Sequence, residues 1–523
     1  MKLGTNLSGV VDWSTQLPFL DMIKMSRPWY AFGEGQFNNY EYLHGNGHLD
    51  AAGWPASIPH AGNIQTIFDL KPGHYLTGRN HTLRWQGNGA IVITGASNVV
   101  TGPNRISFDW GTGALGIIIT ATATAPNNIR AMTLVRTDRM ALLDGGGLFN
   151  PEFLGFVRGM GHLRFMDWQC TNNSDQTDWI DRPLGSKVTY AEDVNGFAPM
   201  MRGVPLGVCV ALCNRLRIPG WFNIPHRATD AYVASMAAFI RDNLSPDLFA
   251  YFEYSNEVWN NMFAQTAYAA QQGGAGFQNS LKWYGKRSGE CFAIIDTVFA
   301  KTPARARKVL ATQSSAWAVE QVLTPGADHI AVTSYFGYGL QLDTARVAAI
   351  DRAYPVTSDA VIQGYLTDPA HDWSLPAWRE NMLAISATAK AHGLTMLLYE
   401  GGCHAQMNNT AGTATTQAAV LKHHLSGLQA GNYEYLWNVW QSEVEAGGAF
   451  SVYADIGAWG VNGNWTLAQT YGQPLFPAAA RLITLSRLSP ADAVLRGAMG
   501  IFETVKLVGY DKAGNQVMRE TRP

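Results

Sequence analysis

Between about residue 150 and about residue 480, short apolar runs alternate with longer segments whose apolar residues recur at helical spacing. This alternation is typical of β/α units, in which each strand of a parallel sheet is followed by a helix that covers it. Helical spacing is clearest from Thr229 to Asn243 and from Ala377 to His392. The expected strands are His162–Met166, Leu206–Leu212, Leu248–Tyr254, Lys308–Thr312, His329–Ser334, Thr395–Tyr399 and Tyr433–Val439.

The number of strands favours one α/β architecture over another. Seven strands in that region and one expected between Leu3 and Val11 make eight, the number in a (β/α)8 TIM barrel. The alternative is a doubly wound sheet, which would need a glycine-rich phosphate-binding turn after a strand. The sequence has no convincing GxGxxG in such a place, so we expect the barrel.

A different pattern occupies residues 60–140, where turn clusters such as Gly87-Asn88-Gly89 separate short β-like runs. Short strands that recur with turns every 8–12 residues or so predict a small antiparallel β-sandwich. We expect this β-rich module to interrupt the barrel or to pack beside it. Its predicted strands are Ile64–Phe68, Thr82–Trp85, Ala90–Thr94, Gly116–Thr120 and Met132–Val135.

These patterns divide the chain into four parts. The runs Val505–Tyr510 and Gln516–Met518, with a turn-forming segment between them, predict a short C-terminal β hairpin. The expected parts are residues 1–59 with the first barrel strand and an N-terminal segment, 60–140 with the accessory module, 141–485 with the rest of the barrel, and 486–523 with the C-terminal β extension.

Composition excludes several classes of partner. A net charge of −2 over 523 residues leaves no basic surface for nucleic acid or anionic lipid. No apolar stretch reaches the roughly 18 residues of a membrane-spanning helix. Five scattered cysteines do not make a disulfide framework. No HExxH motif or histidine cluster predicts a metal, and we expect no cofactor. Low charge with 17 Trp, 20 Tyr and 22 Phe suits a protein that stacks aromatic rings on a neutral ligand such as a sugar.

Two glutamates come directly after predicted strands. Glu257 follows Leu248–Tyr254, and Glu400 follows Thr395–Tyr399. Because all strands of a β/α barrel direct their C-terminal ends toward the functional face, both carboxylates are expected there. If Glu257 follows the fourth strand, Glu400 ends the seventh. A carboxylate at such a rim is costly to desolvate, which invites a catalytic explanation. Two of them match the acid and the nucleophile or base of glycoside hydrolysis.

The residues around both glutamates resemble a known group of enzymes. Glu253-Tyr254-Ser255-Asn256-Glu257 resembles the Glu-x-x-Asn-Glu end of the fourth strand in clan A glycoside hydrolases, which are retaining β/α-barrel enzymes of the cellulase, mannanase, xylosidase and iduronidase kind. Tyr399-Glu400-Gly401-Gly402 is similar to that clan's seventh-strand nucleophile motif, usually Thr-Glu-x-Gly. Val258 stands where proline often follows, and Tyr399 replaces the usual threonine. The resemblance names no family within the clan.

The resemblance implies a double displacement. Glu400 would attack the anomeric carbon, while Glu257 would protonate the leaving oxygen and later deprotonate the incoming water. That mechanism needs carboxyl groups about 5–5.5 Å apart. It also implies that the pKa of Glu257 is raised and that hydrogen-bond donors hold Glu400 ionised. Arg164, expected on the second strand, would contact the nucleophile and lower its pKa, or else would form an ordinary ion pair.

Further residues take supporting roles by the same resemblance. Asn256 would bind the sugar 2-hydroxyl, or would cap the following helix. Tyr335 occupies the sixth-strand position from which a tyrosine of the clan bonds the nucleophile. Trp437, on the expected eighth strand, would provide the stacking platform. Glu253 is expected to be a structural carboxylate inside the barrel.

A loop rich in sugar-binding residue types is expected near the third strand, from Pro219 to His226. Its Trp221, Asn223 and His226 could each line a subsite, and a core aromatic and a capping histidine are the alternatives. Several tryptophans could line a longer cleft, namely Trp13, Trp29, Trp54, Trp179, Trp221, Trp283 and Trp459.

The sequence thus predicts a retaining glycoside hydrolase that cleaves a β-linked polysaccharide internally. An exo-acting glycosidase, a non-catalytic polysaccharide-binding protein such as a surface or virion adhesin, and a polysaccharide lyase stay open as alternatives. The N-terminus lacks the long apolar stretch of a signal peptide, yet the substrate class favours a secreted or extracellular protein. The sequence does not indicate the oligomeric state.

Overall fold

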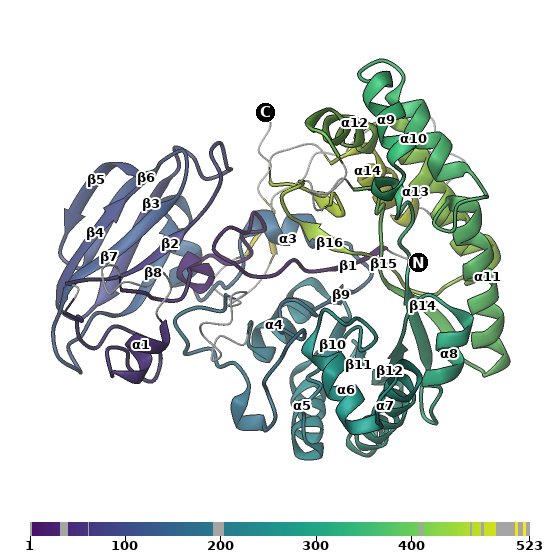
Figure 1. The fold of residues 1–523 in the computed structure, drawn as a ribbon. Helices are drawn as coiled ribbons and strands as arrows, with labels where there is room; N and C mark the ends of the chain where they lie inside the picture. The colour runs from purple at the N-terminus through teal and green to yellow at the C-terminus, as the bar shows by residue number, and fades with distance from the viewer. Residues whose placement is uncertain are drawn as a thin grey trace.

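The protein consists of a closed β/α barrel and a β-sandwich beside it (Figure 1). The chain leaves the first barrel strand, crosses to the sandwich and returns to complete the barrel (Figure 1). The computed structural model describes residues 3–31, 40–60, 62–191, 203–406, 412–460, 463–471, 475–487, 508–510 and 516–518.

The barrel has eight parallel strands. They are β1 (Leu3–Asn6), β9 (Leu163–Arg164), β10 (Gly220–Ile224), β11 (Ala250–Tyr254), β12 (Ala306–Ala311), β13 (His329–Thr333), β14 (Thr395–Glu400) and β15 (Phe450–Val452). Each strand pairs with the next along the chain, and β1 pairs with both β9 and β15, which closes the ring. The predicted TIM barrel is confirmed.

Helices surround the barrel and connect its strands (Figure 1). The two helices predicted from apolar spacing are present, and the Thr229 and Ser374 side chains cap their N-termini. The barrel helices are α4 (Leu206–Leu216), α5 (Asp230–Asn243), α6 (Ala264–Gly273), α7 (Phe277–Val298), α8 (Ala316–Val322), α9 (Thr344–Ala353), α10 (Ser358–Thr367), α11 (Leu375–Ala391), α12 (Ala414–His424), α13 (Gly427–Val439) and α14 (Pro477–Arg487). None of the helices in these described ranges is long and apolar enough to span a bilayer.

Two expected strands are helices instead. Leu206–Leu212 lies in α4, and Tyr433–Val439 lies in α13. Both runs are rich in apolar residues, and an apolar run of this length does not distinguish a buried strand from a buried helix. In each case the true strand, β10 or β15, comes next in the chain. The count of eight is therefore unchanged, and Glu257 still follows the fourth strand while Glu400 ends the seventh.

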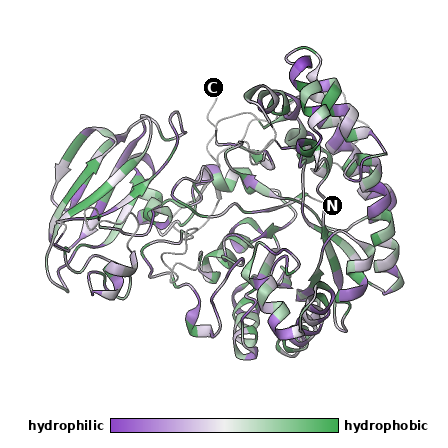
Figure 2. Ribbon diagram, viewed as in Figure 1, coloured by the Kyte–Doolittle hydropathy of each residue, from purple (hydrophilic) through white to green (hydrophobic). Residues whose placement is uncertain are grey.

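The sandwich is built from two antiparallel sheets. One contains β2 (Ile64–Phe68), β7 (Leu115–Thr122) and β4 (Gly89–Thr94); the other contains β5 (Ala96–Gly102), β6 (Arg105–Trp110), β3 (Asn80–Gln86) and β8 (Arg130–Arg136). Alternate residues of β6 and β7 are buried, as expected for two sheets packed face to face. Hydrophobic residues mark much of these strands and of the barrel strands in Figure 2. The predicted short strands are present, whereas β5 and β6 are additional.

Short elements join the sandwich to the barrel. They are η1 (Met22–Met25), α1 (Tyr40–Gly45), η2 (Thr137–Arg139), α2 (Met140–Asp144) and α3 (Pro151–Val157). The Asp21 carboxylate accepts hydrogen bonds from the backbone of Ile23 at 3.1 Å and from Leu134 of β8 at 3.0 Å. One hydrophobic core cluster includes residues of both parts, so the sandwich is packed onto the barrel rather than tethered to it.

Two pairings involve only the remaining strands. Beyond the barrel, β16 (Ala454–Ile456) pairs with β17 (Thr466–Ala468). At the C-terminus, β18 (Val508–Tyr510) and β19 (Gln516–Met518) form the expected antiparallel pair. The segment between them, residues 511–515, lies outside the described residues, as do residues 505–507 of the predicted run. Short helical turns η3 (Trp179–Asp181), η4 (Pro303–Arg305), η5 (Leu340–Leu342) and η6 (Trp440–Val444) complete the described part.

Candidate active site

Side chains fill the barrel interior up to the level of the candidate residues. Inward-facing residues of β10, β11 and β14, among them Trp221, Tyr251 and Leu397, form a buried cluster. Because side chains alternate along a strand, the next inward positions toward the C-terminal ends are Glu253 on β11 and Tyr399 on β14. A polar layer therefore rests directly on a hydrophobic one.

Arg164, at the end of β9, is the centre of this polar layer and is wholly buried. Its Nε and Nη2 atoms donate to the two carboxylate oxygens of Glu253 at 3.0 and 2.9 Å. Its Nη1 donates to Oε2 of Glu400 at 3.3 Å, and Nη2 donates to Oδ1 of Asn256 at 2.8 Å. The guanidinium also lies 4.8 Å from the centre of the Tyr399 ring. One cation thus ties together residues of the second, fourth and seventh strands.

The Glu400 carboxylate is surrounded by hydrogen-bond donors and almost fully buried. Besides Arg164, it accepts from Nδ2 of Asn6 at 3.2 Å and from the Tyr335 hydroxyl at 3.0 Å. Burial nevertheless raises the pKa of Glu400 to about 8, and the nearby Glu257 charge adds to the rise while Arg164 opposes it. The expectation that donors hold Glu400 ionised is therefore wrong for the free protein, because desolvation outweighs them.

An irregularity at the end of β14 brings two successive side chains to the same site. The pairing of β13 with β14 shifts between Val332 and Thr333, so that Tyr399 is the extra residue. In a regular strand, Tyr399 and Glu400 would point to opposite faces. Here the Tyr399 hydroxyl donates to Oε1 of Glu257 at 3.1 Å, while the Glu400 carboxylate accepts a hydrogen bond from Arg164. The two glutamates are consequently linked through one tyrosine, because Glu257 accepts from its hydroxyl and Glu400 is the next residue in the chain.

The backbone around Glu257 has an uncommon conformation. Just after β11, Ser255 and Glu257 have φ angles of 61° and 41°, the left-handed region that side chains other than glycine rarely adopt. The Glu257 carboxylate also accepts from Nδ2 of Asn260 at 2.9 Å. Its side chain is partly exposed, in contrast to Glu400. Unusual backbone angles that the surrounding structure maintains are typical of functional sites.

Asn256 is held by protein groups on both ends of its amide. Its Oδ1 accepts from Arg164, and its Nδ2 donates to Oδ1 of Asn172 at 3.0 Å. Gln265 of α6 donates both to that same Asn172 oxygen, at 2.7 Å, and to the Asn256 backbone carbonyl, at 2.8 Å. This network fixes the turn that carries Glu257.

Aromatic rings gather on the Glu400 side of the site. The Tyr335 ring contacts His404 at 5.1 Å and Tyr453 at 6.4 Å between ring centres. Tyr338 contacts His404 at 5.2 Å, and the series continues from His404 to Trp465 at 5.2 Å. Tyr338 also packs against Trp373, and both side chains are partly exposed to solvent, at 37% and 42%. Burial lowers the pKa of His404 to about 4, so its ring is neutral. Flat, uncharged faces of this kind suit sugar rings.

Trp437 lies away from this group. Because its segment belongs to α13 and not to the eighth strand, the ring packs against Phe450 at 5.5 Å and is buried. The prediction of a stacking platform at Trp437 is wrong. The residue that directly follows β15 is Tyr453, which contacts Tyr335.

The expected loop from Pro219 to His226 contains strand β10, and this changes the places of its side chains. Trp221 is fully buried below the site and donates its Nε1 hydrogen to Oε2 of Glu253 at 2.7 Å. Asn223 is buried and donates to the backbone carbonyl of Ser255 at 2.9 Å. His226 is also buried. None of the three presents an open subsite surface. Of the tryptophans predicted to line a longer cleft, Trp29, Trp54 and Trp221 are instead buried in the core.

Sequence reasoning missed three residues that contact the glutamates. They are Asn6 on Glu400, and Tyr399 and Asn260 on Glu257. Asn6 had a usable signal, since it is a polar residue that ends the first strand at the functional face. Tyr399 had none, because the irregularity that redirects it depends on the pairing with β13.

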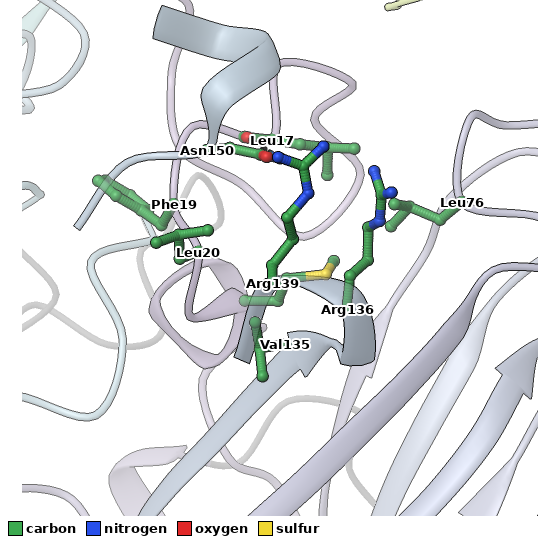
Figure 3. Close-up of a pocket in the computed structure, with 9 residues that line it drawn as sticks. Leu17, Phe19, Leu20, Leu76, Val135, Arg136, Arg139 and Asn150 are labelled. Carbon is green, nitrogen blue, oxygen red and sulfur yellow. Dashed lines mark hydrogen bonds between the residues drawn. The ribbon is translucent and has the colours of Figure 1, made fainter. Parts of the chain in front are cut away.

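A small pocket lies elsewhere, at the junction of the sandwich and the barrel. Figure 3 shows Arg136 and Arg139 beside each other, with Leu17 and Asn150 nearby. None of the residues that contact Glu257 or Glu400 lines it. Across the described ranges, no group of three or more His, Cys, Asp and Glu residues is arranged to hold a metal ion.

Comparison with known proteins gives structural neighbours only. No protein-family model and no curated protein sequence matches the chain. The structure is similar to xylanase 10C from Cellvibrio japonicus, with 10% identity over 81% of this chain and 91% of that one and a TM-score of 0.37. It is similar to a Bacteroidetes-affiliated GH5 cellulase, with 10% identity, 66% and 88% coverage and a TM-score of 0.36.

A third neighbour is the GH51 arabinofuranosidase from Xanthomonas axonopodis pv. citri, with 13% identity, 67% and 66% coverage and a TM-score of 0.35. By name these three neighbours are a xylanase, a cellulase and an arabinofuranosidase, and the similarity assigns no family to this chain.

Proposed function

We propose that this protein is a retaining glycoside hydrolase that cleaves a β-linked polysaccharide. One observation carries the proposal: at the C-terminal end of a closed barrel, Glu257, after the fourth strand, accepts from the hydroxyl of Tyr399, the residue directly before Glu400 on the seventh strand. Two carboxyl groups that face a common space are what glycosidic bond cleavage needs.

The charge state of the pair suits the first step. Glu257 is near enough to raise the pKa of Glu400, so the two groups together hold a proton near neutral pH. Cleavage needs one carboxylate that attacks and one acid that donates. The cation of Arg164 and the donors Asn6 and Tyr335 stabilise the ionised form of Glu400, which is the form that attacks.

In the proposed mechanism, Glu400 attacks the anomeric carbon while Glu257 protonates the oxygen of the departing sugar. A glycosyl ester on Glu400 results. Glu257, now ionised, takes a proton from water, and the hydroxide oxygen attacks the same carbon and releases Glu400. The partial exposure of Glu257 and the burial of Glu400 fit this division, because only Glu257 must meet incoming water.

The aromatic rings near Glu400 support a sugar as the substrate. Tyr338, His404 and Trp465 form a connected uncharged surface next to Tyr335, which itself bonds Glu400. Aromatic faces stack on sugar rings at low cost in side-chain entropy. We propose internal cleavage of a polymer, secretion or another extracellular location, and supporting roles for Arg164, Asn256 and Tyr335.

The test separates the two glutamates by leaving-group dependence. On a polysaccharide that the wild type degrades, we expect Glu257→Ala to lose roughly 10²–10⁴-fold in kcat, since proton donation is worth about that much. The same variant should keep most of its activity on 2,4-dinitrophenyl glycosides, whose leaving group needs no acid, and azide should restore turnover. Glu400→Gln should be inactive on both substrates. Exposed Glu380→Gln is the matched control and should resemble the wild type.

Three outcomes would contradict the proposal. If Glu257→Ala loses the same activity on activated and on natural substrates, Glu257 is not the general acid. A polysaccharide that binds without release of reducing ends would indicate a binding protein. Products with a new double bond in a uronic acid ring would indicate a lyase.

A further inference from the structure

Two exposed aromatic side chains stack on each other on the outer wall of the barrel. Phe277 begins α7, and Trp317 is the second residue of α8. Their ring centres are 6.0 Å apart and their planes differ by 15°. Phe277 is 42% exposed and Trp317 is 48% exposed, although a folded chain usually covers side chains of this size. We call this pair the α7–α8 platform.

Topology places the platform at the rim that carries the two glutamates. Only four residues, 312–315, separate the end of β12 from α8, so Trp317 lies near the C-terminal end of that strand. The 22-residue helix α7 is about 33 Å long and leads back to the start of β12, so Phe277 lies at the opposite end, at the same rim. Figure 1 shows α6, α7 and α8 near β11 and β12, and β11 is the strand that precedes Glu257.

Polar groups of the platform are uncharged amides. Gln278, next to Phe277, donates to Oε1 of Gln321 at 2.6 Å. Gln321 is one helical turn after Trp317 and donates to its backbone carbonyl at 3.2 Å. Flat rings bordered by amide donors and acceptors match the alternating apolar faces and hydroxyl edges of a sugar chain.

Close packing of the two helices keeps the rings in place. A Cβ atom on Gly285 would lie 2.4 Å from the backbone oxygen of Val322, and one on Gly289 would lie 2.2 Å from the Thr324 hydroxyl. The glycines therefore let α7 approach the end of α8 without side chains between them. A platform that is rigid before binding loses little entropy when a ligand stacks on it.

We propose that the α7–α8 platform binds sugar units of the polysaccharide on the leaving-group side of the cleavage point. The inference rests on the proposed function, because Glu257, the proposed acid, belongs to the same sector of the rim. It adds a distal subsite that neither glutamate contacts, and it makes the substrate a chain long enough to reach from the glutamates to the outer wall.

Affinity electrophoresis tests the platform without any need for turnover. Gels would contain mixed-linkage β-glucan, glucomannan or arabinoxylan. We expect one polymer to retard the wild type, and Trp317→Ala to weaken that retention roughly two- to tenfold, the value of one aromatic stacking contact. Trp317→Phe should keep most of the affinity. Tyr42→Ala, which removes a 37% exposed ring from α1, is the matched control and should migrate like the wild type.

Turnover distinguishes this proposal from the one on which it rests. On 2,4-dinitrophenyl glycosides, which are too short to reach the platform, Trp317→Ala should equal the wild type, whereas on the polymer its KM should rise with little change in kcat. Equal retardation of wild type and Trp317→Ala, or no retardation in any of the gels, would overturn the platform. Retardation that depends on Trp317 in a protein that hydrolyses nothing would keep the platform and overturn the hydrolase.

Discussion

The contacts of the buried Arg164 guanidinium explain why the ionised form of Glu400 is poorly stabilised, although several hydrogen-bond donors surround its carboxylate. Glu253 binds Arg164 in a bidentate manner, so most of the cationic charge already has a partner. Glu400 is the second carboxylate on the same cation, and Glu257 is nearby. The cluster thus holds one arginine against three acidic groups. A proton on the Glu400–Glu257 pair relieves that excess.

This excess of acidic groups predicts that Glu400, when it ionises, lowers the free energy of unfolding, and that the effect depends on pH. Its folded-state pKa of about 8 is above the unfolded value of 4.5, so the folded protein binds more protons between these limits and its stability falls as pH rises through them. We expect Glu400→Gln, which stays neutral, to be more stable than the wild type by on the order of 3–4 kcal/mol at about pH 8 and by little at about pH 5. Urea unfolding at several pH values measures the difference.

The same experiment has an internal control in the neighbouring glutamate. Glu257→Gln removes the charge that raises the pKa of Glu400. The stability of this variant should therefore still fall as pH rises, but less steeply than that of the wild type. Asp21, Asp167 and Asp455, whose pKa values burial raises to about 6, are present in every variant and cancel in the differences. Parallel curves for wild type and Glu400→Gln would show that Glu400 titrates normally.

The positions of the two glutamates could be predicted from sequence because they depend on strand order alone. The positions of the strands themselves are harder to predict from the sequence. The run Leu206–Leu212 has no polar interruption, and the same run serves as the buried face of α4. The missed third strand, β10, is buried at every position and so shows no alternation, and the missed eighth strand, β15, has only three residues. The prediction for Trp437 is wrong for this reason, because its segment is the helix that precedes the short strand β15.

Helix packing gives a prediction with opposite signs at two glycines. Gly285, inside α7, would place a Cβ atom against the Val322 backbone, so Gly285→Ala must separate α7 from α8 and should destabilise the protein by about 1–3 kcal/mol. Gly431, inside α13, is exposed, and a Cβ atom added there would meet no other part of the protein within 4 Å. Gly431→Ala should stabilise by about 0.5–1 kcal/mol, because alanine favours the helix. The denaturant midpoints of the two variants measure these changes in stability. A change of the same sign at both sites would contradict the packing argument.

The joining of sandwich and barrel depends on contacts between residues far apart in the sequence. Composition and turn spacing predicted the sandwich, yet nothing in the chain indicated that Asp21 would accept from the backbone of β8. Such a contact has no periodic signal, because it depends on where two finished elements meet. The aromatic rings around Glu400 come from separate loops after β13, β14 and β15 and were equally invisible as a group.

Glu152 is the residue through which this junction can be tested. It is on α3, and its Oε1 accepts from the Tyr75 hydroxyl at 2.8 Å and from Nη1 of Arg136 at 3.1 Å, while Arg139 donates to the same oxygen. All three donors precede α3 in the chain, two of them in or directly after β8. Loss of the carboxylate would leave partly buried guanidinium groups with less compensation.

We therefore expect Glu152→Ala to lower stability by about 1–3 kcal/mol and to loosen the sandwich from the barrel. Calorimetry should show one transition for the wild type and a broadened or divided transition for the variant, since the shared core no longer couples the parts fully. Hydrolysis of a short activated glycoside at low temperature should be unchanged, because Glu152 contacts neither proposed catalytic residue. Glu380→Ala, which breaks only an exposed ion pair with Arg379, should leave the transition in place. A single, unshifted transition in Glu152→Ala would show that the hydrophobic contacts alone hold the two parts together.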